Sequence, residues 1–190
     1  MDVLSSARQK GWSSTPCAGL VMLSDAAIKK GESTESNSFS LDLKRWLTVM
    51  RAYENGGHAY HATRPTDSLR QFRDTILEAK EIGFDTLCDA QWELGKRIRK
   101  VLADKGIESV AAEGFEAPGV VVSYTDRDDI HKGTAFAEAG LQIAAGVPLK
   151  VGEPENFKTF RLGLFGLDKL TDVDGAVQRF ETTLDDVLAK

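Results

Sequence analysis

The chain has 190 residues, which is enough for one domain, or for a small domain plus part of another. Hydrophobic side chains make up 42% of it and charged side chains 28%, ordinary values for a soluble globular protein. The net charge is −5, from 24 basic and 29 acidic residues. A negative charge of this kind does not favour binding to nucleic acid or to an anionic membrane.

The cysteine content points to a reducing compartment. Cys17 and Cys88 have no metal-type spacing and no histidine near either, so we expect neither a metal site nor a disulfide framework. The N-terminus lacks the pattern of a signal peptide, and the longest apolar run, Ala18 to Leu23, is too short to span a bilayer. These features predict a cytoplasmic protein.

The first part of the chain is predicted to hold a short strand followed by helices. Ala18 to Leu23 has the pattern of a short buried strand, and Ser24-Asp25 can cap a brief helix after it. Helical spacing resumes at Leu41 and stops at Asn55-Gly56-Gly57. The segment from His58 to Pro65 is irregular.

Two helices in tandem come next. Thr66-Asp67 begins the first, Gly83 breaks it, and Asp85 begins a longer helix that ends at Gly106. This arrangement predicts a hinge or domain boundary near residues 83–85.

The last part of the chain is predicted to interleave strands with helices. Strand-like segments run over 107–111, 120–124 and 157–165, and a helix is expected over 128–139. A capping box at 171–174 opens the last helix. The apolar stripe of that helix is Val173, Ala176, Val177, Phe180, Leu184 and Val187. Strands interleaved with helices predict an α/β fold.

Lys10 is the first candidate for chemistry. It follows a β-like segment and precedes a turn-rich, hydroxyl-rich stretch over residues 11–16. A lysine so placed can point into a partly dry pocket, where desolvation favours the neutral amine that forms a Schiff base. The alternative is a surface lysine in a loop, which is the commoner case for a lysine taken alone.

Arg161 is a candidate for binding a carboxylate. It lies mid-strand within 157–165, and Gly163 leaves room above the same face. A guanidinium there suits bidentate capture of a carboxylate. A structural ion pair with an internal acidic residue explains such an arginine equally well.

Tyr60 and Thr63 lie in the irregular segment after Gly56-Gly57. Hydroxyls there can bind phosphate oxygens, and paired glycines let the backbone approach a ligand. The alternative is ordinary turn chemistry in a connecting loop. His58 and His61 lack companion ligands, so we assign neither to a metal.

Five segments, in order along the chain, carry a family resemblance: 9–12 (QKGW), 16–24 (PCAGLVMLS), 60–63 (YHAT), 140–143 (GLQI) and 160–166 (FRLGLFG). They resemble the class V pyridoxal-phosphate aminotransferases, in particular the alanine–glyoxylate and serine–glyoxylate branch. The resemblance runs from about residue 2 to the C-terminus. It implies an α/β fold, the C-terminal part of a fold-type-I PLP-dependent transferase. Residues 1–84 would end the large PLP-binding domain, and residues 85–190 would form the small C-terminal domain.

The resemblance also implies an activity: amino-group transfer from a small amino acid of the alanine or serine type to a 2-oxo acid such as glyoxylate. Lys10 would hold pyridoxal 5′-phosphate as a Schiff base and move a proton between substrate and cofactor. Gln9 would contact the cofactor phosphate. Tyr60 and Thr63 would reach the phosphate of the neighbouring subunit, giving a homodimer with a shared active site. Arg161 would bind the substrate carboxylate.

The sequence departs from the family in two ways. Arg8 stands where relatives usually carry a small residue or proline. The family's larger N-terminal portion has no counterpart here, including its glycine-rich phosphate turn, the aromatic that stacks on the pyridine ring and the aspartate that pairs with the ring nitrogen. We therefore expect an N-terminally truncated chain whose strand 18–23 and helix 41–50 lack apolar partners, so that it associates or is poorly soluble.

Two alternatives stay open beside the aminotransferase. One is a non-catalytic remnant that at most associates with a full-length relative. The other is a cysteine desulfurase-like lyase, a group with histidine before the Schiff-base lysine and a mobile reactive cysteine. Here Gln9 rather than histidine precedes Lys10, and Cys17 lies in an apolar stretch that is predicted to belong to the core. The lyase is therefore disfavoured.

Overall fold

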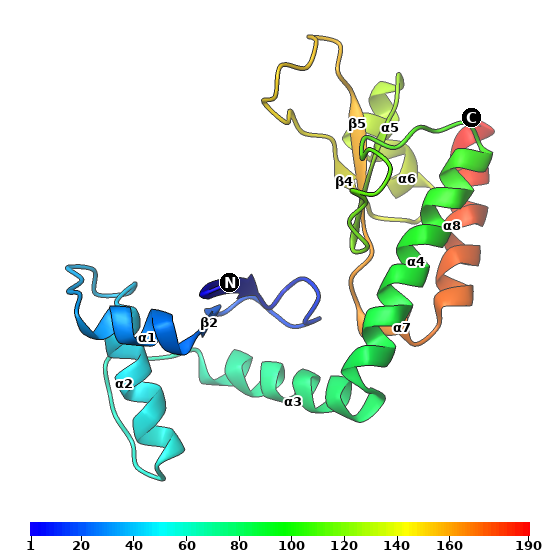
Figure 1. Cartoon of the computed structure of the whole chain (residues 1–190). Coiled ribbons are helices and arrows are strands. Elements are labelled where there is room, and N and C mark those ends of the chain that lie inside the picture. The colour runs from blue at the N-terminus through cyan, green and yellow to red at the C-terminus, as the bar shows by residue number, and fades with distance from the viewer. The chain divides into compact units, whose positions relative to one another are not determined.

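The computed structural model describes the whole chain, Met1 to Lys190 (Figure 1). The residues form two compact units, Met1–Thr75 and Ile76–Lys190. The boundary between them falls within a single helix, α3 (Thr66–Ile82). Among the helices, none combines the length and the hydrophobicity that crossing a membrane requires. The assignment of 1–84 and 85–190 to two family domains stays a prediction.

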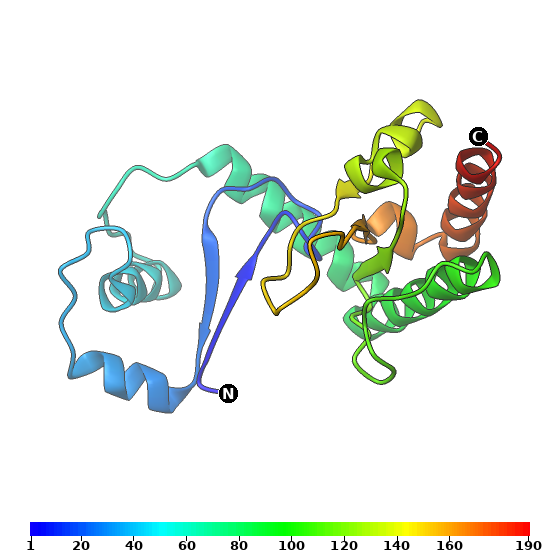
Figure 2. The same ribbon diagram turned by 90° about the horizontal axis from the view of Figure 1, so that it is seen from above.

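The first unit contains a two-stranded antiparallel hairpin (Figure 2). In it β1 (Val3–Ala7) pairs with β2 (Gly19–Leu23). The predicted strand over 18–23 is therefore confirmed. Its apolar pattern predicted burial, but Val21 and Met22 are 41% and 45% exposed, which agrees with the expectation that this strand lacks apolar partners. No third strand joins the hairpin, so apolar side chains on it remain in contact with solvent.

Helices α1 (Asp25–Glu32) and α2 (Leu43–Glu54) follow the hairpin. Ser24 and Asp42 cap them, each accepting a hydrogen bond from the backbone N–H three residues further on. The second helix ends before Gly56, whose φ of +78° is a left-handed conformation that glycine adopts without strain. The predicted helix stop is confirmed.

The second unit contains a three-stranded antiparallel sheet with the strand order β3-β5-β4. Its strands are β3 (Val120–Tyr124), β4 (Ala144–Ala145) and β5 (Thr159–Gly163), and β5 lies in the centre. The predicted strands near 120–124 and 157–165 are confirmed. The segment 107–111 is not a strand, because it contributes only the isolated bridge from Ser109 to Ser123.

Two long helices pack side by side in this unit, α4 (Phe84–Asp104) and α8 (Val173–Leu188) (Figure 1). Gly83, with φ of +103°, separates α3 from α4 as predicted. The apolar stripe of α8 is also confirmed: its members Val177, Phe180, Leu184 and Val187 are buried. They share one core with residues of α4, of the sheet and of the segment between β3 and β4, among them Leu94, Ile98, Leu102, Val121, Phe136, Phe160 and Leu162.

Two local predictions in this unit are wrong in detail. The expected helix over 128–139 is divided into α5 (Asp128–Lys132) and α6 (Thr134–Glu138), because Gly133 between them adopts φ of +78°. A short helix, α7 (Leu167–Leu170), precedes α8. The cap of α8 is Asp172, whose carboxylate accepts the Gly175 N–H at 2.9 Å; the predicted cap was one residue earlier.

Candidate functional site

Lys10 lies in the connection between β1 and β2, on a segment we call the Lys10 turn (residues 8–14). Two backbone hydrogen bonds close it, from Ser13 N–H to the Lys10 carbonyl at 2.9 Å and from Ser14 N–H to the Arg8 carbonyl at 3.1 Å. Lys10 and Gln9 are both exposed. The Lys10 side chain is therefore in contact with solvent, and its placement in a partly dry pocket stays a prediction.

The opposite side of the Lys10 turn is held by Arg8. Its side chain is buried, with 1% of its surface exposed, and Arg8 is the one charged residue of the chain that is buried. Its Nε donates a hydrogen bond to the Ala18 carbonyl at 3.0 Å, and its Cζ lies 4.9 Å from the centroid of the Phe72 ring on α3. Trp12 meets the same ring edge-on at 6.0 Å. Sequence reasoning identified Arg8 only as a departure from the family and missed this contact.

Tyr60 and Thr63 are brought together by the loop between α2 and α3. Their hydroxyl oxygens are 3.1 Å apart, and Tyr60 is 78% exposed. His61 anchors the loop, because its Nε2 is 2.9 Å from the Phe39 carbonyl and the two rings lie 4.3 Å apart. No hydrogen bond joins the hydroxyl pair to the Lys10 turn. Thr63 is exposed as well, so the hydroxyl pair faces solvent.

Arg161 occupies the central strand of the second unit, opposite Val122 of β3 and Ala144 of β4. Its Nε donates to the Ala145 carbonyl at 2.9 Å, and no acidic side chain forms a salt bridge with it. The internal ion pair that we considered is therefore absent. One hydrogen bond orients the guanidinium while both terminal nitrogens stay available for a bidentate carboxylate. Arg161 and Lys10 belong to different units.

The connection between β4 and β5, the neighbours of Arg161, is organised by Glu153. Its carboxylate accepts hydrogen bonds from Lys150 N–H at 2.7 Å and from Val151 N–H at 2.8 Å. Backbone donors of this kind favour the charged form, and they lower the pKa of Glu153 to about 2. His131 fixes the other end of the same connection, since its Nδ1 donates to the Thr159 carbonyl at 2.7 Å.

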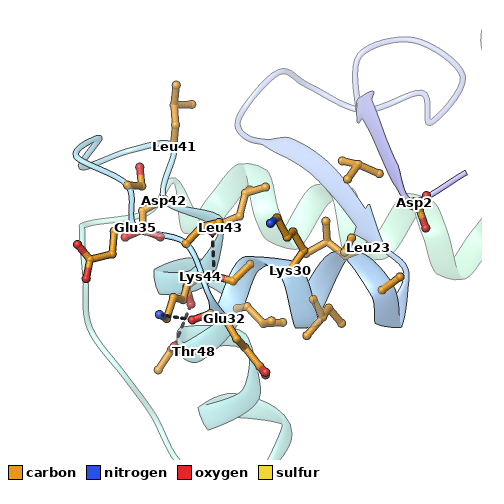
Figure 3. A pocket seen from close by; sticks show the side chains of 18 of the residues that line it. Asp2, Leu23, Lys30, Glu32, Glu35, Leu41, Asp42, Leu43, Lys44 and Thr48 are labelled. Atoms are coloured by element: carbon orange, nitrogen blue, oxygen red, sulfur yellow. Dashed lines mark hydrogen bonds between the residues drawn. The ribbon is translucent and has the colours of Figure 1, made fainter.

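A hollow of about 730 Å³ lies in the first unit, beside α1 and α2 (Figure 3). Its lining includes apolar side chains such as Leu23 and Leu43, and it contains none of the predicted site residues. Lys44 lies on it, but the amine already donates to the Glu32 carbonyl at 3.0 Å. Charged side chains such as Lys30, Glu32 and Asp42 also line the hollow. No group of three or more His, Cys, Asp or Glu side chains is placed to hold a metal ion.

Comparisons with known proteins give a fold. No family model matches the chain, and no curated protein matches it. Among solved structures, it is similar to alanine–glyoxylate aminotransferase from Nostoc sp., with a TM-score of 0.74 and 21% identity over 97% of this chain and 48% of that one. It is also similar to aspartate aminotransferase from Thermus thermophilus, with a TM-score of 0.74 and 24% identity over 98% of this chain and 50% of that one.

A more distant likeness is to a structure of SPT with a PLP internal aldimine, with a TM-score of 0.53 and 10% identity over 98% of this chain and 40% of that one. At these identities the likeness establishes the fold, and the predicted fold class is confirmed. This chain spans about half the length of the solved structures it matches. It has the mixed α/β fold of the C-terminal half of PLP-dependent aminotransferases.

Proposed function

We propose that this chain carries the lysine side of an aminotransferase active site. The reaction would move an amino group from a small amino acid, of the alanine or serine type, to a 2-oxo acid such as glyoxylate. The fold likeness supports the reaction class. The observation that carries the proposal is the Lys10 turn itself. The Lys10 amine is exposed on this turn, and the buried Arg8 packs on the Phe72 ring on the opposite side of it.

The residues present fit two parts of pyridoxal 5′-phosphate, its aldehyde and its phosphate. A primary amine such as that of Lys10 is the group that captures an aldehyde, and the Gln9 amide and the Tyr60 and Thr63 hydroxyls are donors suited to phosphate oxygens. When bound, the cofactor supplies the electron sink for bond changes at the substrate α-carbon. We assign no residue of this chain to its ring.

Lys10 and Arg161 would divide the work on the substrate. The Lys10 amine would take the proton from the substrate α-carbon as a general base and then, as a general acid, would deliver it to the cofactor's aldehyde carbon. Arg161 would hold the α-carboxylate. Its hydrogen bond to the Ala145 carbonyl fixes the plane of the guanidinium in advance, which reduces the entropy lost when a carboxylate binds.

We propose a homodimer in which Tyr60 and Thr63 serve the site of the neighbouring subunit. Two features support this arrangement: the exposure of Tyr60 and the lack of a hydrogen bond from the hydroxyl pair to the Lys10 turn of the same chain. We place the protein in the cytoplasm, in keeping with Cys17 and Cys88, which are both free thiols.

Reductive trapping tests the proposal. The purified chain is mixed with pyridoxal 5′-phosphate and reduced with borohydride, and the adduct is mapped by mass spectrometry. We expect one stoichiometric adduct on Lys10, lost in Lys10→Met and retained in the matched control Lys30→Met. Equal, partial labelling of all exposed lysines would contradict the proposal.

That negative result would favour a second candidate, a non-catalytic chain that associates with a longer relative. The exposed apolar residues of the first unit, such as Leu4 and Met22 at 45% each, are the observation in its favour. Mixing the chain with a full-length relative and measuring the mass of the product by light scattering would then identify the association.

A further inference from the structure

Arg8 is buried without an anion. The side chain is 1% exposed, it forms no salt bridge, and its Nη1 and Nη2 have no hydrogen-bond partner. A buried guanidinium normally needs compensation, because removing the charge from water is costly. The compensation here comes from the face of the Phe72 ring, 4.9 Å from Cζ, and from the Ala18 carbonyl that accepts from Nε.

The same contacts fasten the Lys10 turn at both ends. The Arg8 carbonyl accepts from Ser14 N–H, closing the turn, while the Arg8 side chain reaches Ala18, the residue before β2. Trp12 meets Phe72 edge-on, and its Nε1 donates to Ser6 Oγ at 3.3 Å. Lys10 lies between these fixed points, although it makes none of the contacts itself.

A further hydrogen bond ties the segment after the turn to α3. Thr15 Oγ1 donates to Gln71 Oε1 at 2.8 Å, one residue before Phe72. The turn is therefore attached to one short stretch of helix by a hydroxyl, an aromatic edge and a buried cation. Of the three, the cation is the least replaceable, since a planar guanidinium can stack on a ring and donate in its plane at once, and a lysine cannot.

We propose that Arg8 is a positioning residue for Lys10, and that its guanidinium, held between Ala18 and Phe72, sets the conformation in which the turn presents the Lys10 amine. This inference rests on the proposed function of Lys10. It assigns to Arg8 and Phe72 a role in orienting a reactive group rather than in touching substrate or cofactor. Reactions of held groups are sensitive to placement, so loosening the turn should lower the capture of an aldehyde at Lys10.

The test uses the full chain and pyridoxal 5′-phosphate with borohydride, and measures the adduct on Lys10 relative to that on Lys30 in the same sample. The variants are Arg8→Met, which removes the charge, and Phe72→Leu, which removes the ring but keeps an apolar side chain. We expect each to lower the Lys10 to Lys30 ratio by about tenfold or more. Phe72→Tyr should restore the ratio, and the exposed control Arg70→Met should leave it unchanged.

A second measurement guards against a general loss of folding. Circular dichroism at the labelling temperature confirms that each variant keeps its helices, and the double variant Arg8→Met/Phe72→Leu is compared with Phe72→Leu alone. Phe72→Leu strands a buried charge and the double variant does not, so we expect the double variant to have the higher melting temperature. An equal or lower melting temperature of the double variant would mean that the Phe72 ring does not compensate the Arg8 charge, and this would overturn the inference that the ring holds the guanidinium in place.

The outcomes separate the inference from the proposed function. If the unmodified chain labels at Lys10 and Arg8→Met labels equally well, Arg8 has no positioning role while the proposed function stands. If the unmodified chain shows no preference for Lys10, the proposed function fails, and the positioning role fails with it.

Discussion

The two units bury their apolar residues to very different degrees. In the second unit Phe136 and Leu184 are fully buried and Leu94 is 1% exposed, within one core shared by the sheet and its helices. In the first unit Val3 is 52% exposed and Met22 is 45% exposed. Both sets come from regular, strongly patterned elements. The difference is whether the chain supplies a second layer for each element to pack against.

The contrast shows which unit can be stable by itself. The second unit has helices to cover one face of its sheet, whereas the hairpin of the first unit has no third strand. A two-stranded hairpin is marginally stable in water unless something packs on it. The stability of the first unit, which carries Lys10, therefore depends on another surface packing against its hairpin. We expect the purified chain to associate with itself at the exposed apolar residues of this unit.

The largest expected effect is on the core of the second unit. Phe136→Ala should lower the free energy of unfolding by about 3–5 kcal/mol, because it removes a fully buried ring that packs beside Phe160 and Phe180. Met22→Ala in the first unit should change it by about 0.5 kcal/mol or less, since that side chain is largely exposed. Urea titration followed by circular dichroism measures both. Equal effects would mean that the first unit is covered in solution.

The two units are also predicted to act on different ligands. In a form of the protein that turns over, Arg161→Lys should weaken amino-acid and 2-oxo-acid binding by about 1.5–3 kcal/mol and leave cofactor capture nearly intact. Lys10→Met should do the reverse and abolish covalent capture. Half-saturation by amino acid and the absorbance of the bound cofactor separate the effects. An unchanged half-saturation in Arg161→Lys would mean that Arg161 is structural.

Glycine substitutions sharpen the comparison of packing. A Cβ at Gly95 on α4 would lie 2.6 Å from the Pro118 carbonyl oxygen, so Gly95→Ala should destabilise the second unit by about 1–3 kcal/mol. A Cβ at Gly11 in the Lys10 turn meets nothing within 4 Å. Gly11→Ala should therefore be neutral or stabilise by up to about 1 kcal/mol. Thermal unfolding of both variants checks the sign of each effect, and a destabilised Gly11→Ala would indicate hidden contacts at the turn.

The smallest expected effect concerns acid. Asp128, Asp129 and Glu153, whose pKa values are lowered by hydrogen bonds, all lie in the second unit. A lowered pKa contributes stability above the ordinary value of the carboxyl, and that stability is lost as the pH falls through the folded value. The Glu153 loop should therefore keep its form on acidification until the pH approaches about 2. Amide shifts of Lys150 and Val151, followed by NMR, should titrate there, and a midpoint near 4.5 would contradict the assignment.

Local patterns in the sequence predicted most of the second unit. The stripe of α8 and the break at Gly83 follow from spacing and backbone preference, which need no knowledge of distant residues. The exposure of Val21 could not be predicted in the same way, because the burial of a strand residue depends on which other elements pack on the face of its sheet. Spacing also missed the division of α5 from α6, since glycine inside a helical pattern is often tolerated.

The candidate site was predictable only in part. Residue types and order indicated Lys10, Gln9, Tyr60, Thr63 and Arg161, and their roles stay predictions. The sequence could not indicate the contacts that hold the segments carrying these residues in place. The contact of Arg8 with Phe72 and that of His61 with Phe39 join segments far apart in the chain, and a lone arginine or histidine carries no local signal of its partner.

The free edges of the hairpin place the chain in a kinetic competition during folding. Each of β1 and β2 is hydrogen-bonded along one side only, so each offers a row of backbone donors and acceptors to whichever strand arrives first. A strand that extends the sheet beside the Lys10 turn would pair with one of these edges. A second copy of the hairpin arriving first would occupy the same edge and lead toward aggregation. The yield of folded protein should therefore fall as its concentration during refolding rises.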